Sequence, residues 1–85
     1  PKLAMPQFKQ YRANDGKFYF KLVDGDGDLL LQSAGFDSPK EAGALIAGIK
    51  AGSITIETLG ERIERIAGVE DDAIAAAIRQ LQEAG

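Results

Sequence analysis

Aspartates occupy every second position of Asp24-Gly-Asp-Gly-Asp28, which is the spacing of the first calcium ligands in an EF-hand loop. The rest of that loop is missing, because position six would be Leu29 instead of glycine and position twelve would be Gly35 instead of a bidentate glutamate. Aspartate and glycine are also the residues that tight turns favour, since both tolerate positive φ values. We therefore interpret residues 24–28 as a hairpin turn and expect no metal site there.

Other chemistry is limited by the residue types that the chain lacks. It has no histidine and no cysteine, which removes the commonest general base, the commonest metal ligand and the cysteine nucleophile. No G-x-x-x-x-G-K-[ST] loop and no strand–glycine–helix unit is present to hold a phosphate or a dinucleotide. Asp71 and Asp72 stand where a helix would begin, so we interpret them as helix caps instead of an acid–base pair. The sequence predicts no catalytic residue, no metal site and no cofactor in this chain.

One group of residues has the composition of a nucleic-acid-binding surface. Alternation along the run from residue 17 to residue 23 places Lys17, Tyr19 and Lys21 on one side of a predicted strand. Lysines that contact phosphate beside aromatic rings that stack on bases are typical of surfaces that bind RNA. An ordinary solvated sheet face with amphipathic tyrosines has the same composition, so the pattern by itself leaves both interpretations open.

The preceding strand adds to this face in one of two ways. A three-residue turn would place Lys9 and Tyr11 across from the second strand, whereas a two-residue turn would place Gln10 and Arg12 there. Either register gives a basic face with at least one aromatic ring. The candidate face for RNA or a protein partner is therefore drawn from six residues: Lys9, Tyr11, Arg12, Lys17, Tyr19 and Lys21.

Charge is distributed unevenly along the chain. Residues 1–23 carry five basic and one acidic side chain, a net charge of +4, whereas residues 24–85 carry five basic and twelve acidic ones, a net charge of −7. The overall net charge of −3 argues against a free-standing nucleic-acid binder. We expect any contact of the candidate face with tRNA to be weak and to fall as salt rises, because so few cations release few counterions.

The elements that must position this face are strands joined by tight turns. Asn14-Asp-Gly16 lies between two alternating runs, which is the strongest short-range signal for a hairpin. Residues 29–33 follow the turn at 24–28 as a third strand, so the chain up to residue 33 predicts a three-stranded antiparallel meander. Its inner face should carry Phe18, Phe20 and Leu22.

Two further apolar residues are expected on the opposite side of the meander. The alternation that sends Leu22 inward sends Val23 outward, and Leu30 should pair with it. Together they would form a small apolar spot on the outer face. Such a spot suggests that another chain or domain covers part of the sheet.

A helix near residues 39–50 is predicted from its start signals. Ser38 can cap it, Pro39 suits its first position, and Glu41 stands three residues after the cap as a capping box requires. Gly52 is a suitable C-terminal stop. Apolar residues follow at helical spacing: Ala42, Leu45, Ile46 and Ile49. We expect this helix to lie across the inner face of the meander.

The rest of the chain is predicted to be mainly helical. Residues 53–57 alternate and could be extended. For residues 58–67 we favour a helix, although a strand over 62–66 paired with 53–57 also fits the pattern. A last helix near 71–83 carries one apolar stripe: Ile74, Ala77, Ile78 and Leu81.

Eighty-five residues suffice for one domain of the α+β class. We divide it into a linker over 1–6, the meander and its helix over 7–52, and a helical extension over 53–85 that packs on the same core. Prolines at positions 1 and 6 favour extended geometry in the linker, and Pro1 fits either a removed initiator methionine or a position inside a longer chain. No apolar run approaches the roughly 18 residues of a membrane span and no signal-peptide pattern opens the sequence, so we expect a soluble, cytoplasmic protein.

A longer pattern runs through residues 7–50: Phe8-x-x-Tyr11, Asp15-Gly16-x-Phe18-x-Phe20-x-Leu22, Asp26-Gly27, Ser33-x-x-Phe36 and Ser38-Pro39-Lys40-Glu41-Ala42. This pattern resembles the YegP-like small domains, in which three strands joined by turns are followed by a helix that closes the sheet. More narrowly, residues 6–12, 16–23 and 30–33 are similar to the extra C-terminal domain of long-form bacterial tryptophanyl-tRNA synthetases.

The resemblance implies a non-catalytic, appended domain whose parent enzyme joins tryptophan to tRNA with ATP. The HIGH-like and KMSKS-like motifs of the synthetase core are absent from these 85 residues, so no catalytic residue carries over. The implied partners are the parent synthetase core, tRNA bound weakly, and a second copy through a dimeric parent, with no membrane. The alternative is a stand-alone interaction module that dimerises through its sheet and binds a protein partner.

Overall fold

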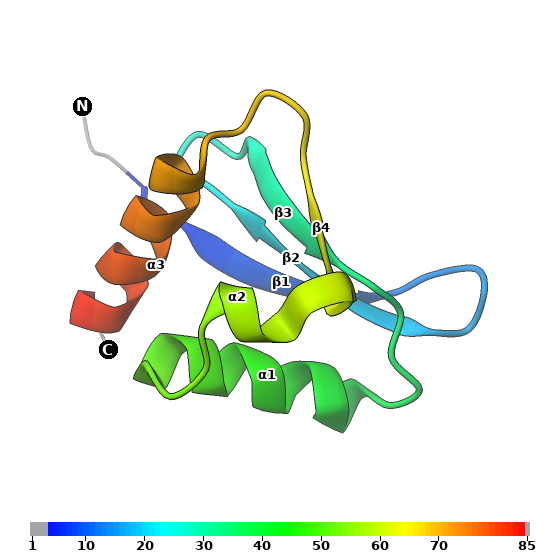
Figure 1. Ribbon diagram of the computed structural model, residues 1–85. Helices are drawn as coiled ribbons and strands as arrows, with labels where there is room; N and C mark the ends of the chain where they lie inside the picture. Colours follow the sequence, from blue (N-terminus) through cyan, green and yellow to red (C-terminus); the bar gives the residue numbers. More distant parts are fainter. Residues whose placement is uncertain (1–3, 85) are drawn as a thin grey trace.

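The structure, a computed structural model, describes residues 4–84 (Figure 1). It has an α+β fold in which one four-stranded antiparallel sheet, in the order β1-β2-β3-β4, is covered by helices. The elements in chain order are β1 (Gln7–Arg12), β2 (Phe18–Val23), β3 (Leu29–Ser33), α1 (Pro39–Ala51), α2 (Ile56–Leu59), the 3₁₀ turn η1 (Gly60–Arg62), β4 (Ile63–Arg65) and α3 (Asp71–Ala84). Within residues 4–84, no helix is both long enough and apolar enough to cross a membrane.

The turn between β1 and β2 has three residues, Asn14 to Gly16. The Ala13 N–H donates to the Lys17 carbonyl oxygen at 3.0 Å, and the Gly16 N–H donates to the Ala13 carbonyl oxygen at 3.0 Å. Gly16 has a φ of +81°, a value that glycine adopts without steric cost. This turn sets the register in which Tyr11 pairs with Tyr19. The hairpin is confirmed, and of the two registers the three-residue alternative is the one that forms.

The turn between β2 and β3 is organised by Asp24. Its Oδ1 accepts hydrogen bonds at 2.9 Å from the backbone N–H groups of Asp26 and Asp28. The Asp24 N–H donates to the Asp28 carbonyl oxygen at 2.9 Å, and Gly27 has a φ of +89°. One oxygen from each of the three carboxylates lies within 4.8 Å of the other two, on a loop whose conformation these bonds already explain. The interpretation of residues 24–28 as a turn is confirmed.

The expected apolar spot on the outer face does not form. Leu22 pairs with Leu31 but Val23 pairs with Leu29, so β3 holds one extra residue, Leu30, in a β-bulge. A single extra residue reverses the alternation of side chains beyond it. Leu30 is therefore directed into the core cluster, where it is 6% exposed. Val23 pairs with Leu29 and does not belong to that cluster, but it is also buried, at 7% exposed.

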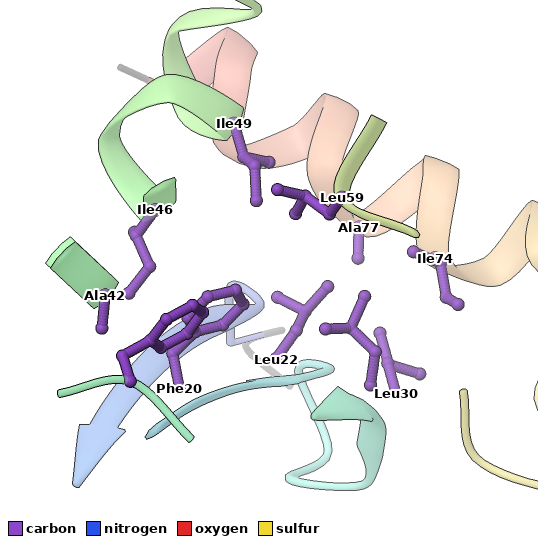
Figure 2. Packing of buried hydrophobic residues seen from close by; sticks show 11 residues of the cluster. Phe20, Leu22, Leu30, Ala42, Ile46, Ile49, Leu59, Ile74 and Ala77 are labelled. Atoms are coloured by element: carbon purple, nitrogen blue, oxygen red, sulfur yellow. The ribbon is translucent and has the colours of Figure 1, made fainter. Parts of the chain in front are cut away.

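The core lies between the sheet and the helices (Figure 2). Phe20, Leu22 and Leu31 are fully buried at its base. The Phe20 ring stacks on Phe36 at a centroid distance of 6.0 Å and meets Phe8 edge-on at 5.8 Å. The helices complete the cluster with Ala42, Ile46 and Ile49 from α1, Leu59 from α2, and Ile74 and Ala77 from α3. The helix that covers the meander is thus confirmed, and α3 shares its core.

Both predicted ends of α1 are confirmed. The Glu41 N–H donates to Ser38 Oγ at 3.2 Å, which satisfies one of the free donors at the helix start. At the other end Gly52 adopts a φ of +82°, and its N–H donates to the carbonyl oxygens of Gly48 and Ile49. This left-handed cap ends the helix at the position that glycine suits best.

The prediction for residues 53–67 is corrected in three respects. Residues 53–57 do not form a strand, because the N–H groups of Ser53 and Ile54 donate to Gly48 and extend the cap of α1. The favoured helix over 58–67 forms only as α2 and η1, which end at Arg62. The next three residues form β4, whose partner is β3 and not residues 53–57. The edge of β3 carries backbone groups that need hydrogen-bond partners, and β4 supplies them.

The start of α3 is also corrected. The helix includes Asp71, so Asp71 and Asp72 lie in its first turn and do not cap it. Negative charges in a first turn still interact favourably with the helix dipole. Asp71 forms an ion pair with Arg65, which ties the start of α3 to β4. Of the predicted linker, residues 1–3 lie outside the described residues, and Pro6 is buried.

Candidate nucleic-acid interface

Five of the six candidate residues lie together on the outer face of the hairpin. The register pairs Lys9 with Lys21 and Tyr11 with Tyr19, and the turn brings Lys17 across from Ala13. We call this set the tyrosine face: Lys9, Tyr11, Lys17, Tyr19 and Lys21. Arg12 is not part of it, because it pairs with Phe18 on the opposite side of the sheet, with its guanidinium carbon 5.4 Å from the centre of the Phe18 ring.

The centre of the tyrosine face is a cross-strand aromatic pair. The rings of Tyr11 and Tyr19 are nearly parallel, at 11°, with their centroids 5.4 Å apart. Stacking of this kind contributes about 0.5–1.5 kcal/mol beyond the burial of area. The Lys21 ammonium lies over the Tyr11 ring, 5.4 Å from its centre, which is within the range of a cation–π interaction. The aromatic and basic side chains are therefore in contact with each other.

The Tyr19 hydroxyl is held by an aspartate of the turn. It donates a hydrogen bond to Asp15 Oδ2, while Asp15 Oδ1 accepts the Lys17 N–H at 2.9 Å. The bond from Tyr19 holds the pKa of Asp15 below its ordinary value, and the same bond raises the pKa of Tyr19. The phenol thus stays protonated and the carboxylate stays charged around neutral pH.

Gly35 leaves the space that this arrangement needs. A Cβ added there would lie 2.7 Å from Lys17 Cδ and 3.1 Å from Tyr19 Cζ, so a larger residue would push both side chains away. The next turn contributes Asp37, whose Oδ1 lies 3.1 Å from Lys17 Nζ in a surface ion pair. The segment between β3 and α1 therefore borders the tyrosine face.

Acidic side chains surround the tyrosine face, and two of them were missed from the sequence. Gln32 pairs with both Lys21 and Glu64, which puts the Glu64 side chain on the same side of the sheet. The pKa of Tyr11 is raised mainly by partial burial and next by the charge of Glu64. Together with Asp15 and Asp37, Glu64 balances the three lysines. No local signal marks Glu64 or Asp37, because strand pairing and a turn bring them to the face.

The geometry suits contact better than catalysis. Stacked phenol rings and two lysines on neighbouring strands can meet an unpaired base and its phosphate. Among residues 4–84, the only lysine of this face that forms a salt bridge is Lys17, so the Lys9 and Lys21 ammonium groups are the cations left to meet a phosphate.

Comparison with known proteins identifies the family. A family model described as a domain of unknown function, DUF1508, matches residues 13–55. This chain belongs to the DUF1508 family. The matched part of the DUF1508 domain runs from the first hairpin turn through β2, β3 and α1, so it includes Lys17, Tyr19 and Lys21 but neither Lys9 nor Tyr11.

Curated relatives are tryptophan–tRNA ligases. The chain is 45% identical over 84 residues to the ligase of Xylella fastidiosa (strain 9a5c), an alignment that covers 99% of this chain and 19% of the ligase. It is 48% identical over 83 residues to that of Xanthomonas axonopodis pv. citri, with 98% and 19% covered. The ligase of Xanthomonas campestris pv. campestris is 70% identical over 46 residues, which are 54% of this chain and 11% of the ligase.

This chain thus spans about a fifth of the length of the first two relatives. No solved structure matches the chain. The resemblance to a YegP-like domain carried by tryptophanyl-tRNA synthetases is confirmed. The two longer alignments also extend beyond residue 55, where the family match ends, and therefore include β4 and α3.

Proposed function

We propose that this chain is a non-catalytic accessory domain of a bacterial tryptophan–tRNA ligase. The observation that carries the proposal is the match of almost the whole chain to ligases in which it makes up about a fifth of the length. The parent would join tryptophan to tRNA with ATP, in the cytoplasm, while this domain contributes no catalytic group. Its partners would be the rest of the ligase and tRNA.

The tyrosine face is the part of the domain that we assign to tRNA. Tyr11 and Tyr19 offer aromatic surface to an unpaired base, and Lys9 and Lys21 offer two phosphate contacts. Two contacts to single-stranded RNA predict a salt slope of about −1.4, so affinity should fall about sevenfold between 50 and 200 mM salt. Such weak binding becomes useful when the parent already holds the tRNA close, because tethering raises the effective concentration.

The test is a titration of the isolated domain with tRNA, followed by NMR at low salt. Amide shifts should be confined to residues 9–21 and their bordering strands. Lys21→Gln should reduce the shifts, whereas Lys50→Gln, which changes the net charge equally at an exposed position of α1, should not. Shifts centred on α3, or no shifts, would contradict the assignment of the tyrosine face to tRNA.

The alternative of a stand-alone module that dimerises through its sheet or through an apolar spot loses one of its two supports. The expected apolar spot consisted of Val23 and Leu30, and both side chains are buried. Among the large apolar side chains of residues 4–84, Met5 is the exposed one, at 42%.

A further inference from the structure

A groove lies on the helical side of the domain, away from the tyrosine face. It runs between the end of α1, residues 54–57 and α3, and it encloses about 270 Å³. Its large apolar side chains are those of five isoleucines: Ile49, Ile54, Ile56, Ile74 and Ile78. Ile49 and Ile74 belong to the core, whereas Ile54, Ile56 and Ile78 are only partly buried and form the accessible surface of the groove.

The walls of the groove are fixed by contacts within the domain. Gln82 Nε2 donates to the Ile49 carbonyl oxygen at 3.0 Å and joins the ends of α3 and α1. The Arg65–Asp71 ion pair closes the other end of the lining. Ile54 packs so closely on α1 that a Cβ at Gly48 would collide with it. The groove is therefore preformed, and a ligand would not have to order it.

The rim of the groove carries two charged side chains that form no salt bridge within the described residues. Arg79 and Glu57 both line it and are exposed, and neither takes part in the two salt bridges formed by residues 4–84. Arg79 follows Ile78 directly, so a cation stands beside accessible apolar surface. A matching partner would present an apolar side chain with a carboxylate next to it, since arginine pairs with carboxylates in a defined geometry.

The alignments show which segments of the groove are found in the ligases. The family match ends at residue 55, so α3, which forms one wall of the groove, lies outside it. The alignments with the two ligases include α3, and each ligase has about four-fifths of its length outside the alignment. The groove is thus completed by a segment that the ligases share and that the family model does not cover.

We propose that this groove docks the domain onto the rest of a tryptophan–tRNA ligase, by taking an apolar side chain of the ligase and pairing Arg79 with a carboxylate beside it. The proposal rests on the accessory role proposed above. It assigns the two sides of the domain to different partners, with the ligase on the helical side and tRNA on the open side of the sheet.

The test is binding in trans, because the domain has a core of its own and can be prepared alone. The ¹⁵N-labelled domain is titrated with the Xanthomonas axonopodis pv. citri ligase from which the matched fifth has been removed, with tryptophan-dependent pyrophosphate exchange as the check that this ligase is folded. Shifts should map to Ile54, Ile56 and Ile78. Arg79→Gln should weaken binding about tenfold or more, since it removes a hydrogen bond between charged groups.

The matched control is Gln80→Glu. It changes the net charge by the same single unit at the neighbouring, exposed position of α3, which does not line the groove. Equal dissociation constants for the two variants, or shifts that map to the tyrosine face, would overturn the docking proposal. So would a lack of shifts up to about 1 mM, the effective concentration that a short linker provides. These outcomes leave the tRNA titration unaffected, so a failure of the groove and a failure of the tRNA assignment are separate results.

Discussion

Phe20 provides the sharpest test of the core. Its side chain is fully buried, stacks on Phe36 and meets Phe8 edge-on, so replacing it with alanine removes all of these contacts at once. Truncation of a buried phenylalanine costs about 3–5 kcal/mol. An 85-residue domain has a free energy of unfolding of about 4–13 kcal/mol at about 0.05–0.15 kcal/mol per residue. Phe20→Ala therefore removes a large share of the total stability.

Thermal unfolding followed by circular dichroism measures the loss. Each kcal/mol shifts the Tm of a domain of this size by about 4–8 °C, so Phe20→Ala should lower the Tm by at least about 12 °C. Met5→Ala serves as the control, because Met5 is 42% exposed and its truncation should stay within about 0.5 kcal/mol. A Tm for Phe20→Ala as close to the parent value as that of Met5→Ala would refute the packing described here.

Three further predictions concern the border of the tyrosine face and the start of α1. The bond from Tyr19 lowers the pKa of Asp15 in the folded state, so the charged carboxylate stabilises the fold above its ordinary pKa of 3.8 and this stabilisation is lost as pH falls through the folded pKa. The Tm difference between the parent and Asp15→Asn should therefore be constant near neutral pH and should shrink below about pH 4. Gly35→Ala should lower the free energy of unfolding in urea by about 1–3 kcal/mol, because the added methyl group would crowd the tyrosine face. Gly43→Ala is the control inside α1: its methyl group would meet only ordinary van der Waals contacts, so it should not destabilise the domain. Ser38→Ala should cost about 1 kcal/mol in the same assay through loss of the cap, and an unchanged midpoint would contradict the hydrogen bond to Glu41.

The parts of the fold that the sequence predicts correctly are those specified by neighbouring residues. The first hairpin follows from Asn14-Asp-Gly16 between two alternating runs, and α1 follows from Ser38 and Gly52 at its ends. Each signal acts within a few residues, so it is visible without knowledge of the tertiary structure.

The errors arise where distant segments decide the local structure. The bulge at Leu30 depends on the register between β3 and β2, which the sequence does not show. Simple alternation along β3 therefore predicted Leu30 on the outer face, whereas it lies in the core. Residues 63–65 fit a helical spacing, yet they form β4 because the edge of β3, about thirty residues earlier, offers backbone partners. A strand of three residues carries too little pattern of its own to compete with the helical spacing of Leu59 and Ile63.

The same distant pairing sets the charge of the candidate site. From the sequence, residues 1–23 have a net charge of +4 and predict a basic face. In the folded domain Glu64 joins that face through β4 and Asp37 pairs with Lys17, while Asp15 binds Tyr19. Charge attraction over a distance is then small, because opposite charges a few ångströms apart largely cancel at longer range, and salt screens what remains beyond a Debye length of about 8 Å. The proposed contact with tRNA should therefore depend mainly on short-range stacking on Tyr11 and Tyr19. It would be weak in the isolated domain and would become useful where a parent ligase already holds the RNA close to the sheet.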